Sequence, residues 1–336
     1  MASVGWAMSD SVLIVLATYQ GAPYLAAQIE SIRQQSWQQW TLLVRDDDST
    51  DDTLAILQDY SRRDARIQCV QDTVGQLGPV GNFSRLLAIA RQQRAQYVFL
   101  ADQDDLWHPE KLRQQLVQLQ QAEQQHSLAL PLLVHADLRL IDAQGQMISP
   151  SFKRYQALPR TPSAPLAILL ASNFVTGCTI GINRALLELA TPLPPAVAMH
   201  DWWLALVAAT SGQILYCDQP LVDYRQHATN CVGGRRGWHS VRRLVRRLRQ
   251  ASSGQGEFVQ SLGQAEVLLH RIQSTGTAYP ADSRQRLLAD YVQIWQTAPP
   301  WSRRLAQVRH LKVRRHPWLR TLVFYLEVIR WQATIK

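Results

Sequence analysis

Three carboxylates fall within four positions at the end of an apolar segment. Residues 97–112 read YVFLADQDDLWHPEKL, so that Asp102, Asp104 and Asp105 follow a run typical of a buried strand. On an extended chain, side chains two positions apart point to the same side, and Asp102 and Asp104 would repel each other. A divalent cation would relieve this repulsion, and oxygen ligands suit Mg²⁺ or Mn²⁺. The alternative is a solvated loop in which Asp105 caps the following helix.

A second acidic run, RDDDSTDD, occupies residues 45–52. Asp51 and Asp52 are expected in the first turn of a helix, where they would favour its dipole. Asp46 or Asp47, at the tip of the preceding strand, would be placed to accept hydrogen bonds from a base or a ribose. The run therefore predicts either a nucleotide-binding edge or simple helix capping.

Two further motifs combine an imidazole with another polar group. In HDWWL, residues 200–204, Asp201 begins a helix beside two tryptophans, which suits a general base over an apolar surface on which sugars stack. In YRQH, residues 224–227, His227 and Arg225 could meet a metal ion or a pyrophosphate. The alternatives are a helix-capping aspartate above core tryptophans and a structural histidine.

The elements that must position these groups alternate between strands and helices. Residues 11–18, SVLIVLAT, predict a strand buried on both faces, and three more strands are expected through Val44, over residues 66–72 and over residues 97–101, with helices between. This order indicates an α/β fold with a mostly parallel central sheet flanked by helices. Ligands bind beyond the carboxyl ends of such strands, where Thr18 and both acidic runs lie.

The rest of the chain is less regular. The pattern predicts helices over residues 109–125 and 200–212, and a hairpin over residues 132–146 with its turn near residues 143–145. Residues 150–165 are expected to form a loop. We further expect a strand and a helix within the segment NFVTGCTIGINRALL and short strands within ILYCDQPLVDYRQHATN.

Charge divides the 336 residues into two parts. The net charge is +9, but residues 1–231 carry a balance of −5 and residues 232–336 a balance of +14. We therefore predict a catalytic domain over residues 11–231 and a basic helical C-terminal region over residues 232–336. Such a region suits an anionic membrane surface, a nucleic acid or another partner, the alternative being a solvated basic face.

Two segments of the C-terminal region are amphipathic or apolar. Residues 241–250, VRRLVRRLRQ, would place apolar side chains on one face of a helix and arginines on its flanks, a pattern typical of helices on anionic lipid. Residues 318–331, WLRTLVFYLEVIRW, are interrupted by three charged residues, which argues against a bilayer span. Contact with a membrane and packing on the catalytic domain are equal alternatives for this segment.

Other features of the sequence favour a cytoplasmic protein. The four cysteines show no C-x-x-C spacing, which argues against a disulfide scaffold or a cysteine zinc site. The N-terminus lacks the pattern of a signal peptide, and the longest apolar runs are shorter than the roughly 20 residues that span a bilayer. We expect a cytoplasmic location, with peripheral attachment to the cytoplasmic face of the inner membrane through the C-terminal region.

Several motifs occur together in one order, and the chain then resembles a known family. The motifs are VLATYQGAPYLAAQIESI, LLVRDDDSTDDT, GNFSRLLAIA, YVFLADQDDLWHPEKL, NFVTGCT, HDWWLAL and YRQHATN. Together they resemble the family 2 inverting glycosyltransferases of the GT-A fold, especially the bacterial rhamnosyltransferase-like branch that builds surface polysaccharides. The resemblance covers about residues 12–230.

The resemblance implies a nucleotide-sugar site at the sheet edge. Thr18 and Tyr19 would line the base, and Asp47 would bond to it. Asp102 would contact the ribose and the metal region, and Asp104 would ligate a Mg²⁺ or Mn²⁺ ion that bridges the diphosphate.

The resemblance also implies roles for residues outside these strands. Asp201 would be the general base, and His227 would approach the metal ion or the diphosphate. Asn82 and Arg85 would border the donor site. Gln20 and Asp48 depart from the residues usual in the family, but neither change removes a catalytic group.

The predicted function is therefore inverting transfer of a sugar, with L-rhamnose as the sugar associated with this branch, from a nucleotide-sugar to a saccharide or lipid-linked saccharide. One alternative is a metal-dependent sugar nucleotidyltransferase, although the loop YQGAP after the first strand is short for that class. Another is a non-enzymatic basic protein that binds nucleic acid. No helix-turn-helix, RRM or zinc-finger motif supports it, and the arginines lie outside the acidic body.

Overall fold

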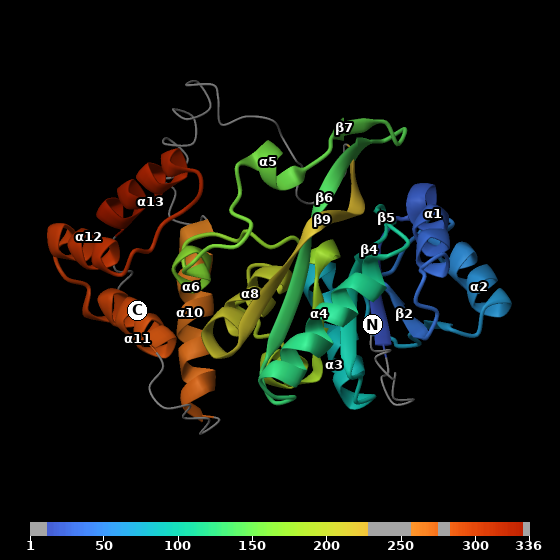
Figure 1. Cartoon of the computed structure of the whole chain (residues 1–336), viewed down its shortest axis with the longest axis horizontal. Coiled ribbons are helices and arrows are strands. Elements are labelled where there is room, and N and C mark those ends of the chain that lie inside the picture. Colours follow the sequence, from blue (N-terminus) through green and yellow to red (C-terminus); the bar gives the residue numbers. More distant parts are fainter. Residues whose placement is uncertain (1–11, 228–256, 275–282, 332–336) are drawn as a thin grey trace.

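The computed structural model describes residues 12–227, 257–274 and 283–331 and contains a curled sheet flanked by helices (Figure 1). The first part of the chain forms β1 (Val12–Thr18), α1 (Ala22–Arg33), β2 (Trp40–Asp46), α2 (Thr53–Arg63), β3 (Ile67–Cys69), α3 (Gly78–Gln92) and β4 (Tyr97–Asp102). Strands β3, β2, β1 and β4 lie side by side in that order and are parallel. The predicted alternation of strands and helices is confirmed here.

The other half of the sheet is mixed. The chain from residue 106 to residue 226 forms this half and its helices: β5 (Leu106–Trp107), α4 (Lys111–Gln125), β6 (Leu132–Asp142), β7 (Met147–Ser149), β8 (Gly181–Asn183), α7 (Arg184–Ala190), α8 (His200–Ser211) and β9 (Gln213–Gln226). Strand β8 runs antiparallel to β4 and β6, whereas β6 and β9 are parallel. The expected hairpin is formed by β6 and β7, and the helix expected over residues 200–212 is α8.

Two local expectations differ from the structure. The segment expected as a loop over residues 150–165 contains the short helix α5 (Phe152–Gln156), because the Ser151 side chain accepts a hydrogen bond from the Arg154 amide and caps it. The helix α6 (Pro165–Leu169) follows. The strand and helix expected within NFVTGCTIGINRALL are β8 and α7, preceded by the 3₁₀ helix η1 (Gly177–Thr179), whereas the short strands expected near the end of the domain are one irregular strand, β9.

The core lies on both faces of the sheet. Strand β1 is apolar at every position from Val12 to Leu16, and its side chains alternate between two separate clusters of buried residues. Helices α3 and α8 cover one face, and α1 and α4 cover the other. Burial on both faces explains why the sequence of β1 shows a continuous apolar run.

The C-terminal helices lie at one end of the molecule, shown in orange and red in Figure 1. They are α10 (Glu257–Ser274), α11 (Ser283–Thr297), α12 (Trp301–His310) and α13 (Trp318–Arg330). Their buried side chains join the core on the α8 side of the sheet. The Tyr291 hydroxyl donates to the Leu170 carbonyl at 3.1 Å, and the Arg315 Nε donates to the Ala171 carbonyl at 2.8 Å. One face of the C-terminal region therefore packs on the sheet domain.

Two expectations concern residues outside the described part of the chain. The basic segment over residues 241–250 and the boundary between residues 231 and 232 both fall there, so the division into two domains stays a prediction. Among the described helices, none has both the length and the hydropathy that crossing a bilayer would require.

Candidate active site

The carboxyl ends of three parallel strands bring the candidate residues to one edge of the sheet. In register, Thr18 of β1 pairs with Asp46 of β2, and Ala17 pairs with Asp102 of β4. The Thr18 hydroxyl donates a 2.8 Å hydrogen bond to Asp46. The sheet topology therefore brings the two acidic runs together. Their strand-end residues, Asp46 and Asp102, are 56 positions apart in the sequence.

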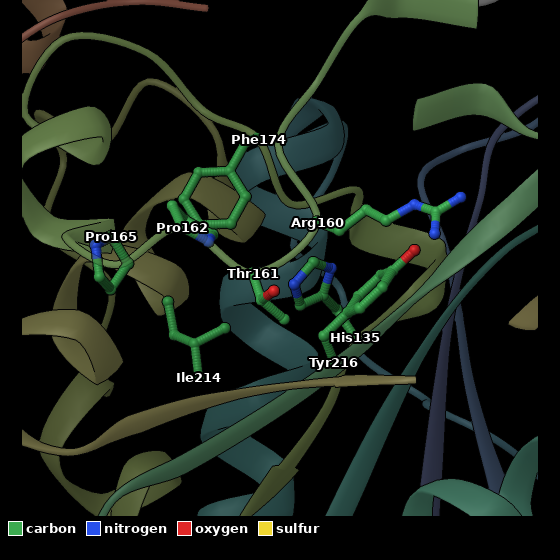
Figure 2. A pocket seen from close by; sticks show the side chains of 8 residues that line it. All are labelled: His135, Arg160, Thr161, Pro162, Pro165, Phe174, Ile214 and Tyr216. Carbon is green, nitrogen blue, oxygen red and sulfur yellow. The ribbon is translucent and has the colours of Figure 1, made fainter. Parts of the chain in front are cut away.

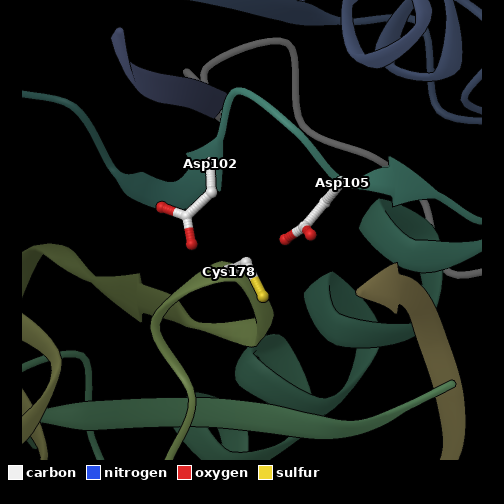
Figure 3. Close-up of side chains that lie close together, drawn as sticks. All are labelled: Asp102, Asp105 and Cys178. Atoms are coloured by element: carbon white, nitrogen blue, oxygen red, sulfur yellow. The ribbon is translucent and has the colours of Figure 1, made fainter. Parts of the chain in front are cut away.

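An acidic cluster lies directly beyond β4. Asp102, Asp105 and Cys178 each offer one ligand atom, and these atoms lie within 4.8 Å of one another (Figure 3). Burial, together with repulsion from Asp104 and Asp201, raises the pKa of Asp102 to about 7. Carboxylates from the strand end, the following turn and α8 therefore share one electrostatic environment.

Asp105 does not cap a helix, and the alternative of a solvated loop with Asp105 as the helix cap is wrong. Its side chain is fully buried, and its Oδ1 atom accepts a 3.2 Å hydrogen bond from the Arg225 amide. The N-cap residue of α4 is Glu110, which makes no side-chain capping bond. A turn at Gln103 and Asp104 breaks the extended run assumed from the sequence and directs Asp105 inwards.

The turn brings Asp104 to the end of β9. The His227 Nε2 atom lies 2.7 Å from the Asp104 Oδ2 atom, and its ring lies 5.0 Å from the ring of Tyr24. The Arg225 Nε donates a 3.0 Å bond to the Asp104 carbonyl, which holds the turn against β9. Asp104 and His227 are thus adjacent although 123 positions separate them.

The chemistry of the potential metal ligands shows whether a hard cation such as Mg²⁺ or Mn²⁺ would fit this cluster. Mg²⁺ and Mn²⁺ favour oxygen ligands, and a coordinating cysteine must be a thiolate. Burial raises the pKa of Cys178 well above its ordinary value, so its thiol stays neutral and suits such a cation poorly. Neighbouring ligands of an octahedral ion at about 2.1 Å lie roughly 3 Å apart. The 2.7 Å pair of Asp104 and His227 fits that spacing, and Asp102 supplies a further oxygen nearby.

Asp201 lies at the start of α8 in a tightly packed environment. Burial raises the pKa of its carboxyl to about 6, although hydrogen bonds from Trp202, Gly177 and Asn173 partly oppose the shift. The Trp202 amide donates at 2.6 Å. A Cβ atom at Gly177 would lie 3.1 Å from His200 Nε2, a tight contact, and 3.5 Å from Asp201 Cβ, so the backbone passes close to the start of α8 here. The carboxyl is suited to exchange a proton near neutral pH.

The imidazole of His200, next to Asp201, is buried in the packing between α8 and α3. His200 stacks on Phe83 with ring centroids 3.9 Å apart, and burial lowers its pKa to about 3. It is therefore neutral at physiological pH, which leaves Asp201 as the group of the HDWWL motif that titrates near neutrality.

The residues expected around the nucleotide base differ in solvent exposure. Tyr19 is 45% exposed, and its backbone forms two 2.8 Å hydrogen bonds with the Gln103 side chain. Asp47 is buried, and it accepts from Arg45 at 2.8 Å and from the amides of Leu77 and Gly78 at 2.8 and 2.7 Å. Asp47 thus lies at the expected strand tip but holds the loop that precedes α3.

Asn82 and Arg85, expected to border the donor site, make contacts within the protein. The buried Asn82 amide donates to the Arg45 carbonyl at 3.1 Å and so joins α3 to β2, and Arg85 pairs with Asp72 at 3.2 Å. Three residues of the site were not singled out from the sequence: Asn173, Gly177 and Cys178. All three belong to the NFVTGCT motif, whose similarity to the family was the one available signal.

A curled α/β sheet with carboxylates gathered beyond its parallel strands defines the class of GT-A glycosyltransferases. Within that class, the profile described as glycosyl transferase family 2 matches residues 13–188, just over half of the chain. The chain therefore belongs to glycosyl transferase family 2.

Individual relatives agree with this assignment. The chain is 27% identical over 227 residues to the dTDP-rhamnosyl transferase RfbG of Shigella flexneri, an alignment that covers 65% of this chain and 73% of the relative. It is 34% identical over 105 residues to the putative teichuronic acid biosynthesis glycosyltransferase TuaG of Bacillus subtilis, which covers 31% of this chain and 40% of that relative.

Solved structures support the fold. The mannosyltransferase PcManGT from Pyrobaculum calidifontis, in complex with GDP-Man and Mn²⁺, has a TM-score of 0.52 at 17% identity, covering 95% of this chain and 85% of the other. Residues 1–349 of TarS from S. aureus, in complex with UDP-GlcNAc, have a TM-score of 0.51 at 14% identity, covering 95% and 90%. The GT-A fold with a C-terminal helical region is thereby confirmed.

Proposed function

We propose that this glycosyltransferase moves a sugar from a nucleotide-sugar to a hydroxyl of a saccharide or lipid-linked saccharide, with inversion at the anomeric carbon, in surface polysaccharide synthesis. L-Rhamnose is the proposed sugar because RfbG, which aligns over 65% of the chain, is a dTDP-rhamnosyl transferase. The observation that carries the proposal is the meeting of Asp102, Asp104 and Asp201 beyond the parallel strands.

Asp201 is the proposed general base. A carboxyl whose pKa is about 6 is largely ionised at neutral pH yet is a stronger base than an ordinary aspartate, because burial disfavours its charge. It would take the proton of the acceptor hydroxyl as that oxygen attacks the anomeric carbon. A single base on the face opposite the leaving diphosphate gives direct displacement, and therefore inversion.

The donor would lie along the strand ends. Thr18, Tyr19 and Asp47 are proposed to bound the base, with the exposed Tyr19 ring available for stacking. Asp102 would contact the ribose and the metal region. Asp104 and His227 would hold Mg²⁺ or Mn²⁺. A bound divalent cation would neutralise the charge that develops on the diphosphate leaving group.

The outer face of α13 supports attachment to a membrane surface. Trp318, Leu322 and Leu326 recur every four positions on one side of the helix, and their side chains are exposed although Phe324 and Val328 of the same helix are buried. Exposed Lys312 and Arg314 precede the helix, and basic side chains favour anionic lipid. We propose a cytoplasmic enzyme that attaches peripherally to the inner membrane near a lipid-linked acceptor.

The test is a donor panel with the purified full chain. dTDP-rhamnose, UDP-glucose, UDP-N-acetylglucosamine and GDP-mannose are each incubated with Mg²⁺, with Mn²⁺ or with EDTA, and nucleoside diphosphate release is measured. We expect more nucleoside diphosphate to be released from dTDP-rhamnose than from the other donors, and we expect this release to be lost in EDTA. If no donor releases nucleoside diphosphate and neither UDP, GDP nor dTDP shows metal-dependent binding, the proposal is contradicted. Release of inorganic pyrophosphate instead would favour a nucleotidyltransferase.

A further inference from the structure

A small cavity lies outside the acidic cluster, between the loop before α6 and the strands β6 and β9 (Figure 2). Its volume is about 60 Å³, room for a few water molecules or one small functional group. Its lining combines polar and apolar side chains, namely His135, Arg160, Thr161, Pro162, Pro165, Phe174, Ile214 and Tyr216. None of these residues has a role in the proposed reaction.

Two of the lining side chains have polar atoms without a partner. His135 is fully buried, and neither of its ring nitrogens has a hydrogen-bond partner among the described residues. The Tyr216 hydroxyl also has no hydrogen-bond partner among the described residues, and the ring centroids of Tyr216 and His135 lie 5.1 Å apart. Buried polar groups are nearly always hydrogen-bonded, because leaving one unsatisfied is costly. These atoms therefore indicate that a hydrogen-bonding group fills the cavity, either water or a group of a ligand.

The charges around the cavity favour an uncharged ligand group. Burial lowers the pKa of His135 well below its ordinary value, with Lys153 adding to the effect, so the neutral ring offers one donor and one acceptor. The Lys153 ammonium is engaged by the carbonyls of Pro159 and Phe174, both at 3.1 Å. Arg160 pairs with Asp218 at 2.9 Å. Both described cations beside this cavity, Lys153 and Arg160, are thus already engaged by protein groups.

One backbone segment connects the cavity to Asp201. Phe174 lines the cavity, and its neighbour Asn173 makes a side-chain hydrogen bond to Asp201. Three positions after Phe174, Gly177 lies against Asp201, since a Cβ atom added there would be 3.5 Å from Asp201 Cβ. The Lys153 bond to the Phe174 carbonyl fixes this segment from the cavity side. The segment that lines the cavity at Phe174 is thus the same segment whose residues Asn173 and Gly177 contact Asp201.

We propose that this cavity binds an uncharged group of the acceptor saccharide, such as a hydroxymethyl or N-acetyl group. The group would exchange hydrogen bonds with the Tyr216 hydroxyl and the His135 ring and would pack its carbon atoms against Pro162, Pro165 and Ile214. It would thereby orient the attacking hydroxyl relative to Asp201 and select the acceptor. This inference rests on the proposed function, because it assigns Asp201 as the base.

The test measures saccharide binding directly, without donor or turnover. Methyl β-glycosides of glucose, N-acetylglucosamine and glucuronic acid are titrated into the full chain, and binding is followed by saturation-transfer NMR. The variant Tyr216→Phe removes one hydroxyl, and Thr161→Trp covers the cavity from its exposed loop. The control Tyr60→Phe makes the same chemical change on α2, which packs beside β3 at the other end of the sheet from β6 and β9.

We expect one of the two uncharged glycosides to bind more tightly than the glucuronide. Tyr216→Phe should weaken that binding roughly threefold to tenfold, the value of one uncharged hydrogen bond, and Thr161→Trp should abolish it. Tyr60→Phe should bind as the wild type does. Equal binding by all four proteins, preferential binding of the glucuronide, or no saccharide binding overturns the proposal.

The donor panel separates the two proposals. Nucleoside diphosphate release with unaltered saccharide binding in Tyr216→Phe contradicts the acceptor cavity alone. Saccharide binding that depends on Tyr216, without turnover of any donor, contradicts the proposed function while leaving a saccharide site at the cavity.

Discussion

Replacing Asp201 with asparagine removes a carboxyl whose proton is held to unusually high pH. Its pKa is about 6 in the folded chain, against 3.8 for an ordinary aspartate, because burial disfavours the charged form. Between these two values the unfolded chain has released the proton and the folded chain has not. The stability that this group contributes is therefore complete below pH 3.8 and is lost as the pH rises through 6.

The size of the effect follows from the two pKa values. The full difference corresponds to about 3 kcal/mol, and the part that falls between pH 4.5 and pH 7.5 is about 2 kcal/mol. Asparagine has no such proton, so the stability of Asp201→Asn relative to wild type should rise by about 2 kcal/mol over this range. Any hydrogen bond lost to the asparagine amide adds a constant offset that does not vary with pH.

The assay is urea unfolding followed by tryptophan fluorescence at four pH values from 4.5 to 7.5. The difference in free energy of unfolding between Asp201→Asn and wild type is plotted against pH. The control is Asp290→Asn, the same change at an exposed position on α11, against which the slope for Asp201→Asn is compared. A flat plot for Asp201→Asn would refute the argument that burial perturbs this carboxyl.

Three further predictions test other parts of the account. Asp104→Asn should weaken Mn²⁺-dependent binding of dTDP at least tenfold and leave metal-free binding unchanged, because it removes a proposed cation ligand; calorimetry with and without EDTA checks this. Gly181→Ala should lower the free energy of unfolding by about 1–3 kcal/mol in urea titrations, since its Cβ would lie 2.4 Å from Phe99 Cε1. Trp318→Ser should reduce binding to phosphatidylglycerol vesicles in sedimentation assays about tenfold or more, whereas Met147→Ser, also an exposed apolar side chain, should not; equal binding by both would contradict the membrane surface on α13.

The parallel half of the sheet could be predicted because its sequence signals are local. Continuous apolar runs ending in polar residues mark β1, β2 and β4, and the rule for ligand sites in parallel sheets points to their carboxyl ends. The 3₁₀ helix η1 within the NFVTGCT segment was not predictable in the same way. Its conformation depends on packing against β4 and α8, which no local pattern reports.

The acidic cluster shows the same limit at the scale of side chains. An alternation argument pairs Asp102 with Asp104, but a turn at residues 103 and 104 instead brings Asp105 next to Asp102 and Cys178. That turn is fixed by Arg225, which lies on a strand 120 positions away. Likewise, the fate of the C-terminal segment as core or membrane contact could not be separated by sequence, because α13 has a buried face and an exposed apolar face.

The most direct measurement of the central claim compares turnover and donor binding in Asp201→Asn. With the donor identified by the panel, kcat should fall at least a hundredfold, because the acceptor hydroxyl loses its base, while the Kd for the donor in the presence of Mn²⁺ should change less than about threefold. Turnover close to that of the wild type would contradict the assignment of Asp201 as the base and, with it, the proposed mechanism of this site.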